Sequence, residues 1–106
     1  MAVEDKTVVA EEDVLAEVRA LDGWEYVGER GLLRRTWHFQ KFVPAMAFVR
    51  KLTEVMDSSN HHSDIALDTR TKTLIVEVTT HTENAVTRAD LDFAAAVNEA
   101  EQTLKP

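Results

Sequence analysis

The chain has 106 residues, 44% of them hydrophobic, a size and composition that suit one compact domain over residues 1–106. Its net charge of −7 argues against a nucleic-acid surface, because phosphate contacts require a positive field. Cysteine is absent, which rules out a disulfide framework, a thiol nucleophile and a thiolate zinc site, and is typical of a cytoplasmic protein.

The first ten residues show no clear periodicity and no signal-peptide pattern. We interpret residues 1–10 as a loose arm or a short edge segment. Nowhere does an apolar run approach the roughly 20 residues of a membrane span, so we expect no membrane partner.

The first predicted elements are a helix and a hairpin. The helix covers residues 11–21 and ends at Asp22-Gly23. Its apolar stripe, at spacings of three and four, consists of Val14, Leu15, Val18 and Leu21. Strands are predicted over 24–27 and 32–39, with a turn between them that has a glycine at each end. On the second strand, alternation predicts that Trp37 and Phe39 point into the core and that His38 points away.

Residues 42–56 give the strongest helix signal. The apolar stripe comprises Ala45, Phe48, Val49, Leu52, Val55 and Met56. Pro44 suits the first turn, where its missing N–H costs nothing. The polar run 57–60 is the predicted end of this helix.

A second hairpin and a last helix complete the predicted order. Strands are expected over 65–68 and 73–80, joined by a polar turn. Thr87-Arg88-Ala89-Asp90 resembles a capping box that opens a helix running to about Leu104. Its predicted apolar stripe consists of Phe93, Ala94, Val97, Ala100 and Leu104.

The order α-β-β-α-β-β-α predicts an α+β fold. Short turns join the members of each strand pair, so both pairs can be antiparallel. Collecting the three helices on one face of a four-stranded antiparallel sheet would bury their apolar stripes.

Three of the four histidines lie in two short stretches, Asn60-His61-His62-Ser63-Asp64 and Thr79-Thr80-His81. Histidine has the unperturbed side-chain pKa closest to neutral, so a cluster can supply an acid and a base at pH 7. We interpret the two stretches as meeting in space to form a solvent-accessible proton-transfer site. Taken alone, neighbouring histidines in a polar loop are more often solvated surface residues.

Several motifs together resemble the pterin-4a-carbinolamine dehydratase family. They are the stretch 57–64, the hairpin ending Thr79-Thr80-His81, Val86-Thr87-Arg88-Ala89-Asp90 at the start of the last helix, and Trp37-His38-Phe39 upstream. The resemblance covers most of the chain, from about Trp24 to the last helix. The family fold is a four-stranded antiparallel sheet with three helices on one side, which agrees with the order predicted from periodicity.

The resemblance implies a reaction and a set of site residues. The family dehydrates the 4a-hydroxytetrahydropterin left by aromatic amino-acid hydroxylases, giving a quinonoid dihydropterin during tetrahydrobiopterin recycling. It implies that His61 and His81 transfer protons, and that His62 binds and orients the substrate. The substrate-binding side chains implied are Asp57, Ser63 and Asp90. The reaction needs no metal and no cofactor, and the family resemblance implies dimers that pair into tetramers.

Two alternatives remain open from the sequence. A metal site could draw on His61, His62, His81 and Asp57, although adjacent loop residues seldom both face one ion. The same fold also serves, in and around the family, as a dimerising partner of a transcription factor and as an assembly factor. Ser63 in place of the usual proline and Ile65 in place of an aromatic favour such a non-catalytic role, whereas the retained histidines favour catalysis.

Overall fold

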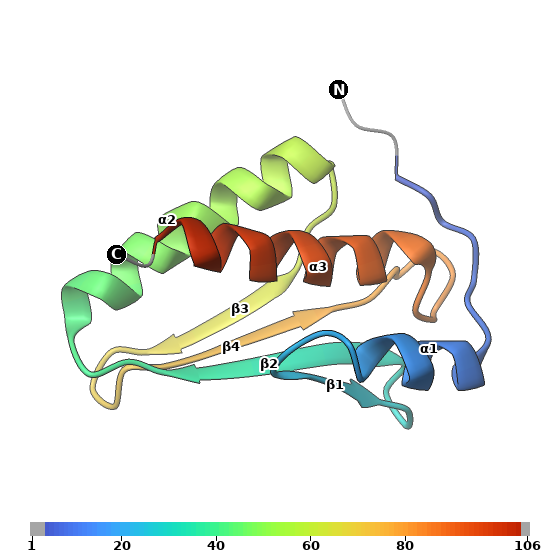
Figure 1. Cartoon of the computed structure of the whole chain (residues 1–106), viewed down its shortest axis with the longest axis horizontal. Helices are drawn as coiled ribbons and strands as arrows, with labels where there is room; N and C mark the ends of the chain where they lie inside the picture. Colours follow the sequence, from blue (N-terminus) through green and yellow to red (C-terminus); the bar gives the residue numbers. More distant parts are fainter. Residues whose placement is uncertain (1–3, 105–106) are drawn as a thin grey trace.

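The computed structural model describes residues 4–104, which form three helices and one four-stranded antiparallel sheet (Figure 1). In chain order, the elements are α1 (Glu11–Val18), β1 (Trp24–Val27), β2 (Leu32–His38), α2 (Phe42–Ser59), β3 (Asp64–Asp68), β4 (Thr73–Val78) and α3 (Arg88–Thr103). The predicted α+β class and the element order are confirmed. Within residues 4–104, no helix is both long enough and apolar enough to cross a bilayer.

The sheet has the strand order β1-β2-β4-β3, so the two hairpins meet through β2 and β4. In that central pairing Leu33 lies opposite Val78, and Trp37 lies opposite Leu74. Figure 1 shows α2 and α3 side by side over the sheet, with α1 beside β1. The helices therefore cover one face and leave the other open.

The core lies between the inner face of the sheet and the helices. Alternate residues of β4 are buried, as period-two alternation requires, and they pack beneath α2 and α3. The fully buried side chains of this layer include Leu33, Leu52, Leu74, Val76, Val78, Phe93 and Val97. Trp37 is buried and Phe39 packs against the core, as predicted, whereas His38 is exposed beside Thr73.

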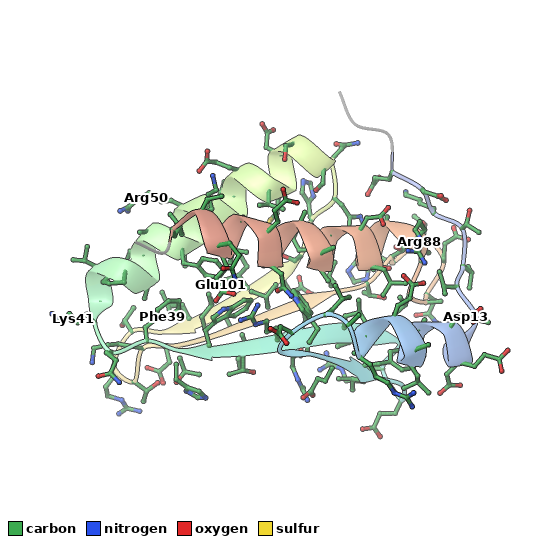
Figure 2. The ribbon with its side chains drawn as sticks, in the orientation of Figure 1. Asp13, Phe39, Lys41, Arg50, Arg88 and Glu101 are labelled. Atoms are coloured by element: carbon green, nitrogen blue, oxygen red, sulfur yellow. The ribbon has the colours of Figure 1, made fainter. Side chains whose placement is uncertain are left out.

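One charged residue, Arg35, lies on the helix-facing side of β2 and has partners there. Its guanidinium donates to both carboxylate oxygens of Glu101 on α3, at 3.0 and 3.2 Å (Figure 2 labels Glu101). The indole Nε1 of Trp37 donates to the same carboxylate at 2.9 Å. Glu101 thereby satisfies two donors and ties the end of α3 to the sheet.

One residue in each of the predicted apolar stripes of α1 and α3 is exposed. Leu15 is 45% exposed and Leu104 is 47% exposed. The short helix α1 ends at Val18 and buries only Val14, because only one narrow side of it meets β1 and α3. Periodicity gives the angle of a side chain around a helix, but not whether a neighbouring element covers that position.

Helix α2 runs to Ser59, three residues beyond the predicted end at Met56. The hydroxyls of Ser58 and Ser59 donate back to the Val55 carbonyl, which lets polar residues continue the helix. Asn60 then takes a left-handed conformation with φ 55°, a common way for a helix to end.

The N-terminal segment, residues 4–9, is an edge segment rather than a loose arm. Val8 and Thr87 form an antiparallel bridge. The amides of Arg88 and Ala89 donate to the carbonyls of Thr7 and Asp5, at 2.9 and 2.7 Å. The prediction for residues 1–3 lies outside the described residues.

Two leucine-to-alanine variants test the assignment of the core. Leu52→Ala removes a side chain that is 1% exposed, so it should lower the free energy of unfolding by about 2–5 kcal/mol. Leu15→Ala makes the same chemical change at an exposed site and should stay within about 0.5 kcal/mol of the wild type. Urea denaturation measures both, and equal losses would contradict the assignment.

Candidate active site

The paired histidines follow directly on the end of α2. The left-handed Asn60 turns the chain, and the amide of His61 donates to the Met56 carbonyl at 3.3 Å. β3 then begins at Asp64, so His61 and His62 occupy a short connection between a core helix and an edge strand. This position fixes the backbone of both residues.

His81 lies just beyond β4, in a tight loop that leads to α3. Thr80 and Ala85 form a bridge across the loop, and the amide of Asn84 donates to the His81 carbonyl at 3.2 Å. β3 and β4 are paired, so the loop after β4 comes close to the connection before β3. The topology thereby brings the two histidine stretches together.

A pocket of about 190 Å³ contains all three histidines. Its walls are Glu4, Lys6, His61, His62, Thr79, Thr80, His81 and Thr82. The predicted meeting of the two stretches is therefore present in the structure. His62 and His81 are exposed at this pocket.

His61 differs from the other two histidines because it is buried, with 6% of its surface exposed. Its Nε2 lies 2.6 Å from Oδ1 of Asp90, and its Nδ1 contacts Oε1 of Glu4. The ring also meets Phe93 edge-on, with 6.0 Å between centroids. The prediction that the rings of His61 and His81 lie at a solvent-accessible site was therefore wrong for His61.

Asp90 is fully buried and uses both carboxylate oxygens inside the protein. Oδ1 accepts from His61, while Oδ2 accepts from the Thr80 hydroxyl at 2.8 Å and from the Thr87 amide at 2.7 Å. With Thr87 it also completes the capping box predicted for α3. Asp90 was predicted to bind substrate, but its burial behind His61 leaves it able to act only through that ring.

The two carboxylates favour the charged form of His61. The hydrogen bond from Asp90 raises the pKa of His61 most, and the Glu4 carboxylate adds to the effect, while burial opposes it. Both ring nitrogens donate when the imidazole is charged, which matches two carboxylate acceptors. The arrangement therefore stabilises an imidazolium next to the pocket.

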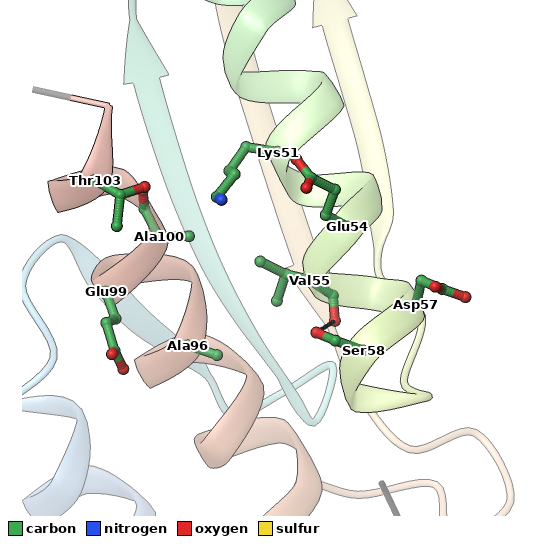
Figure 3. Close-up of a pocket in the computed structure, with 9 residues that line it drawn as sticks. All are labelled: Lys51, Glu54, Val55, Asp57, Ser58, Ala96, Glu99, Ala100 and Thr103. Atoms are coloured by element: carbon green, nitrogen blue, oxygen red, sulfur yellow. Dashed lines mark hydrogen bonds between the residues drawn. The ribbon is translucent and has the colours of Figure 1, made fainter. Parts of the chain in front are cut away.

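Two of the predicted substrate-binding residues lie away from the histidine pocket. Asp57 is exposed on α2 and lines a separate groove of about 550 Å³ between α2 and α3. Figure 3 shows its carboxylate pointing away from α3. Ser63 does not line the pocket, and its hydroxyl is buried without a hydrogen-bond partner among the described residues.

The positions of Asp57 and Ser63 do not fit the predicted contacts with a substrate held by the histidines. Asp57 lines the groove between α2 and α3 and is not part of the wall of the histidine pocket. Within residues 4–104, no group of three His, Asp or Glu side chains is arranged to hold a metal ion.

Sequence reasoning missed Glu4, Lys6 and Thr80 as parts of this site. Glu4 lies 57 residues before its partner His61, in a segment without periodicity. Thr80 was noted only as a neighbour of His81, although its hydroxyl fixes Asp90. Alternation on β4 could have indicated Thr80, since it continues the buried positions of that strand.

Comparison with known sequences gives a family for the chain. The pattern of the family described as Pterin 4 alpha carbinolamine dehydratase matches residues 7–100. The chain belongs to this family. A relative from Mycobacterium avium (strain 104), provisionally named a pterin-4-alpha-carbinolamine dehydratase, is 36% identical over 86% of the chain and 93% of its own length. A Sulfolobus acidocaldarius protein with the same provisional name is 30% identical over 83% and 92%.

Solved structures agree with the fold. The crystal structure of a transcriptional coactivator/pterin dehydratase from Brucella melitensis has a TM-score of 0.80 and 28% identity, and the match covers 89% of this chain and 98% of the other. A pterin dehydratase-like protein, a RuBisCO assembly factor in the alpha-carboxysome, has a TM-score of 0.61, 20% identity and coverage of 74% and 88%. The second similarity shows the shared fold alone.

The charged state of His61 predicts a pH dependence of stability. Its pKa is raised above the unfolded value of about 6.5, so its contribution is complete below that pH and is lost as pH rises through the folded pKa. The free energy of unfolding should therefore decline on the alkaline side. Urea denaturation at a series of pH values from about 6 to about 9 measures this decline.

Two histidine variants identify the group responsible. His61→Gln should abolish most of the decline, whereas His38→Gln, at an exposed position outside the pocket, should leave it unchanged. A decline of the same size in His61→Gln would show that another group causes it.

Proposed function

We propose that this protein dehydrates a pterin-4a-carbinolamine to the quinonoid dihydropterin, with histidines as acid and base. The main support is that His61, His62 and His81 line one pocket in a chain of the dehydratase family. The proposed substrate is 4a-hydroxytetrahydrobiopterin, and the reaction would serve the recycling of tetrahydrobiopterin.

The reaction requires two proton movements and no change of oxidation state. The bond between C4a and the hydroxyl oxygen breaks, and that oxygen gains a proton and leaves as water. The neighbouring nitrogen loses its proton to a base, and a C=N double bond forms. A well-placed acid or base contributes on the order of 10²–10⁴-fold in rate.

His61 suits the role of the acid. Its Nε2 faces the buried Asp90, so the proton on Nδ1 is the one that a bound hydroxyl could receive. Glu4 contacts this nitrogen and lies in the wall of the pocket, so the substrate would take over that hydrogen bond on binding. Hydrogen bonds of this kind commonly rearrange when the substrate arrives.

His81 suits the role of the base, and His62 that of a binding group. Both rings are exposed at the pocket, where a substrate can reach them. The division of roles between His62 and His81 extends the family resemblance.

We also propose that the protein works as a homodimer or a homotetramer. Within residues 4–104, strands β1 and β3 each pair on one side only, and the helices cover one face of the sheet. Such edges are commonly paired or covered in native proteins. Light scattering at micromolar concentration should give a mass above the 12.0 kDa of one chain, and a species of 12.0 kDa alone would contradict the proposal.

A matched pair of histidine variants tests the catalytic role. His81→Gln should lower kcat by about 10²-fold or more if His81 is the base. It should keep its fold, because the ring is exposed. His38→Gln removes the one histidine outside the pocket and should keep wild-type activity.

The assay follows dehydration of a 4a-hydroxytetrahydropterin without added metal, before and after treatment with a chelator. Activity should survive chelation, whereas a zinc enzyme would lose it and regain it with zinc. Unchanged kcat in His81→Gln would contradict the assignment of His81. A wild-type protein no faster than the uncatalysed reaction would favour a non-catalytic interaction role.

A further inference from the structure

Glu4 reaches His61 from a segment that the backbone holds in place. The amides of Arg88 and Ala89 donate to the carbonyls of Thr7 and Asp5, and the amide of Val9 donates to Val86. Figure 1 shows this segment, in blue, running beside the start of α3. The carboxylate of Glu4 is thus presented to the site by a paired strand-like segment.

The surroundings of Glu4 leave it directed mainly at His61. Its Oε1 contacts Nδ1 of His61, and its Oε2 lies 3.8 Å from the ammonium of Lys6, which is 43% exposed. The Glu4 side chain itself is 18% exposed. The longer, solvated contact with Lys6 is a weak one, so the histidine is the dominant partner.

This contact lies outside the region that defines the family. The family pattern matches residues 7–100, which include His61, Asp90 and the pocket threonines but not Glu4. Asp90, the partner of Nε2 of His61, therefore lies within the matched region, whereas Glu4, the partner of Nδ1, lies outside it.

We propose that Glu4 is a positioning residue for His61, whose carboxylate orients the ring and holds the reactive proton on Nδ1 until substrate binds. This inference rests on the proposed dehydratase function. Asp90 cannot hold the proton on Nδ1, because it is buried and bonds the other ring nitrogen, Nε2. Hydrogen bonds from Thr80 and Thr87 also fix its carboxylate in place. Glu4 is partly exposed and has a single close partner, so a substrate hydroxyl can displace it.

Other charged or titratable groups also surround His61. They are Asp90 and Asp92 from α3, Asp5 and Lys6 from the N-terminal segment, and His62 and His81 at the pocket. Among these, Asp90 alone shares a hydrogen bond with the ring within the described residues. Removing the charge of Glu4 therefore leaves Asp90 as the one carboxylate bonded to the His61 ring among the described residues. The charged form of His61 is then less stabilised, while the other acidic groups of the site remain.

The test uses Glu4→Gln, because glutamine keeps an acceptor oxygen but removes the charge. NMR titration of the His61 ring proton reports its midpoint directly and does not depend on activity. The midpoint should shift to lower pH in Glu4→Gln. Glu12→Gln, an equal change of charge at an exposed residue of α1, should leave the midpoint where it is.

The pH–rate profile gives the second measurement. Activity should fall on the alkaline side where His61 loses its proton, and in Glu4→Gln this limb should shift to lower pH together with the NMR midpoint. Activity well below both midpoints should be nearly unchanged, because the ring is then charged in either protein. A role limited to folding would alter stability but would not shift the limb.

The outcomes separate this inference from the proposed function. An unchanged His61 midpoint in folded Glu4→Gln overturns the positioning role, and so does a shifted midpoint in an active enzyme whose alkaline limb stays in place. An inactive wild-type protein whose midpoint still falls in Glu4→Gln overturns the dehydratase proposal. That result would still support the pairing of Glu4 with His61.

Discussion

The site depends on a buried imidazole placed between two carboxylates. An isolated charge in the interior is costly, and a charged pair persists there only when its hydrogen bonds are satisfied. His61 meets this condition because Asp90 and Glu4 accept from its two nitrogens. Removing one partner of a buried ion pair typically costs about 3–5 kcal/mol, so Asp90 supports the fold as well as the charge on the ring.

Asp90 connects this interaction to the architecture. One carboxylate oxygen accepts from His61 just after α2, and the other accepts from Thr80 beyond β4 and from Thr87, the residue that caps α3. A single side chain thus holds together the helix that precedes the paired histidines, the strand that precedes His81, and the last helix. The geometry of the pocket follows from this junction.

The position of the N-terminal segment adds the second carboxylate. The segment pairs with residues 86–89, so its location depends on the same loop and helix start that place Asp90. Both acceptors of the His61 ring are therefore fixed by the beginning of α3. Disturbing that helix start would affect the charge of the histidine as well as the shape of the pocket.

The sequence predicted the fold well because the major elements have strong periodicity. Alternation on β2 identified the inward positions of Trp37 and Phe39, and the apolar stripe of α2 identified the side of that helix that is buried. The meeting of the histidines was expected from their clustering in two short stretches and from the family resemblance, and the strand order of the structure explains it. The predicted burial of Leu15 was wrong because periodicity does not reveal how much of a short helix is covered by neighbouring elements.

The parts of the site that could not be predicted depend on contacts distant in sequence. Glu4 and His61 are 57 residues apart, and nothing in the local pattern of residues 1–10 links them. Asp57 was assigned to the substrate from the resemblance, but its direction depends on the rotation of the last turn of α2. The burial of Asp90 depends on packing of Thr80 and Thr87 around it, which no single segment encodes.

The most direct test is the initial rate of dehydration of a 4a-hydroxytetrahydropterin by the wild-type protein, measured across pH against the uncatalysed reaction. The account predicts acceleration with a bell-shaped profile whose alkaline limb lies above the unperturbed histidine pKa of about 6.5, because the two carboxylates raise the pKa of His61. A rate equal to the uncatalysed one, or an accelerated rate that does not vary with pH, would contradict it.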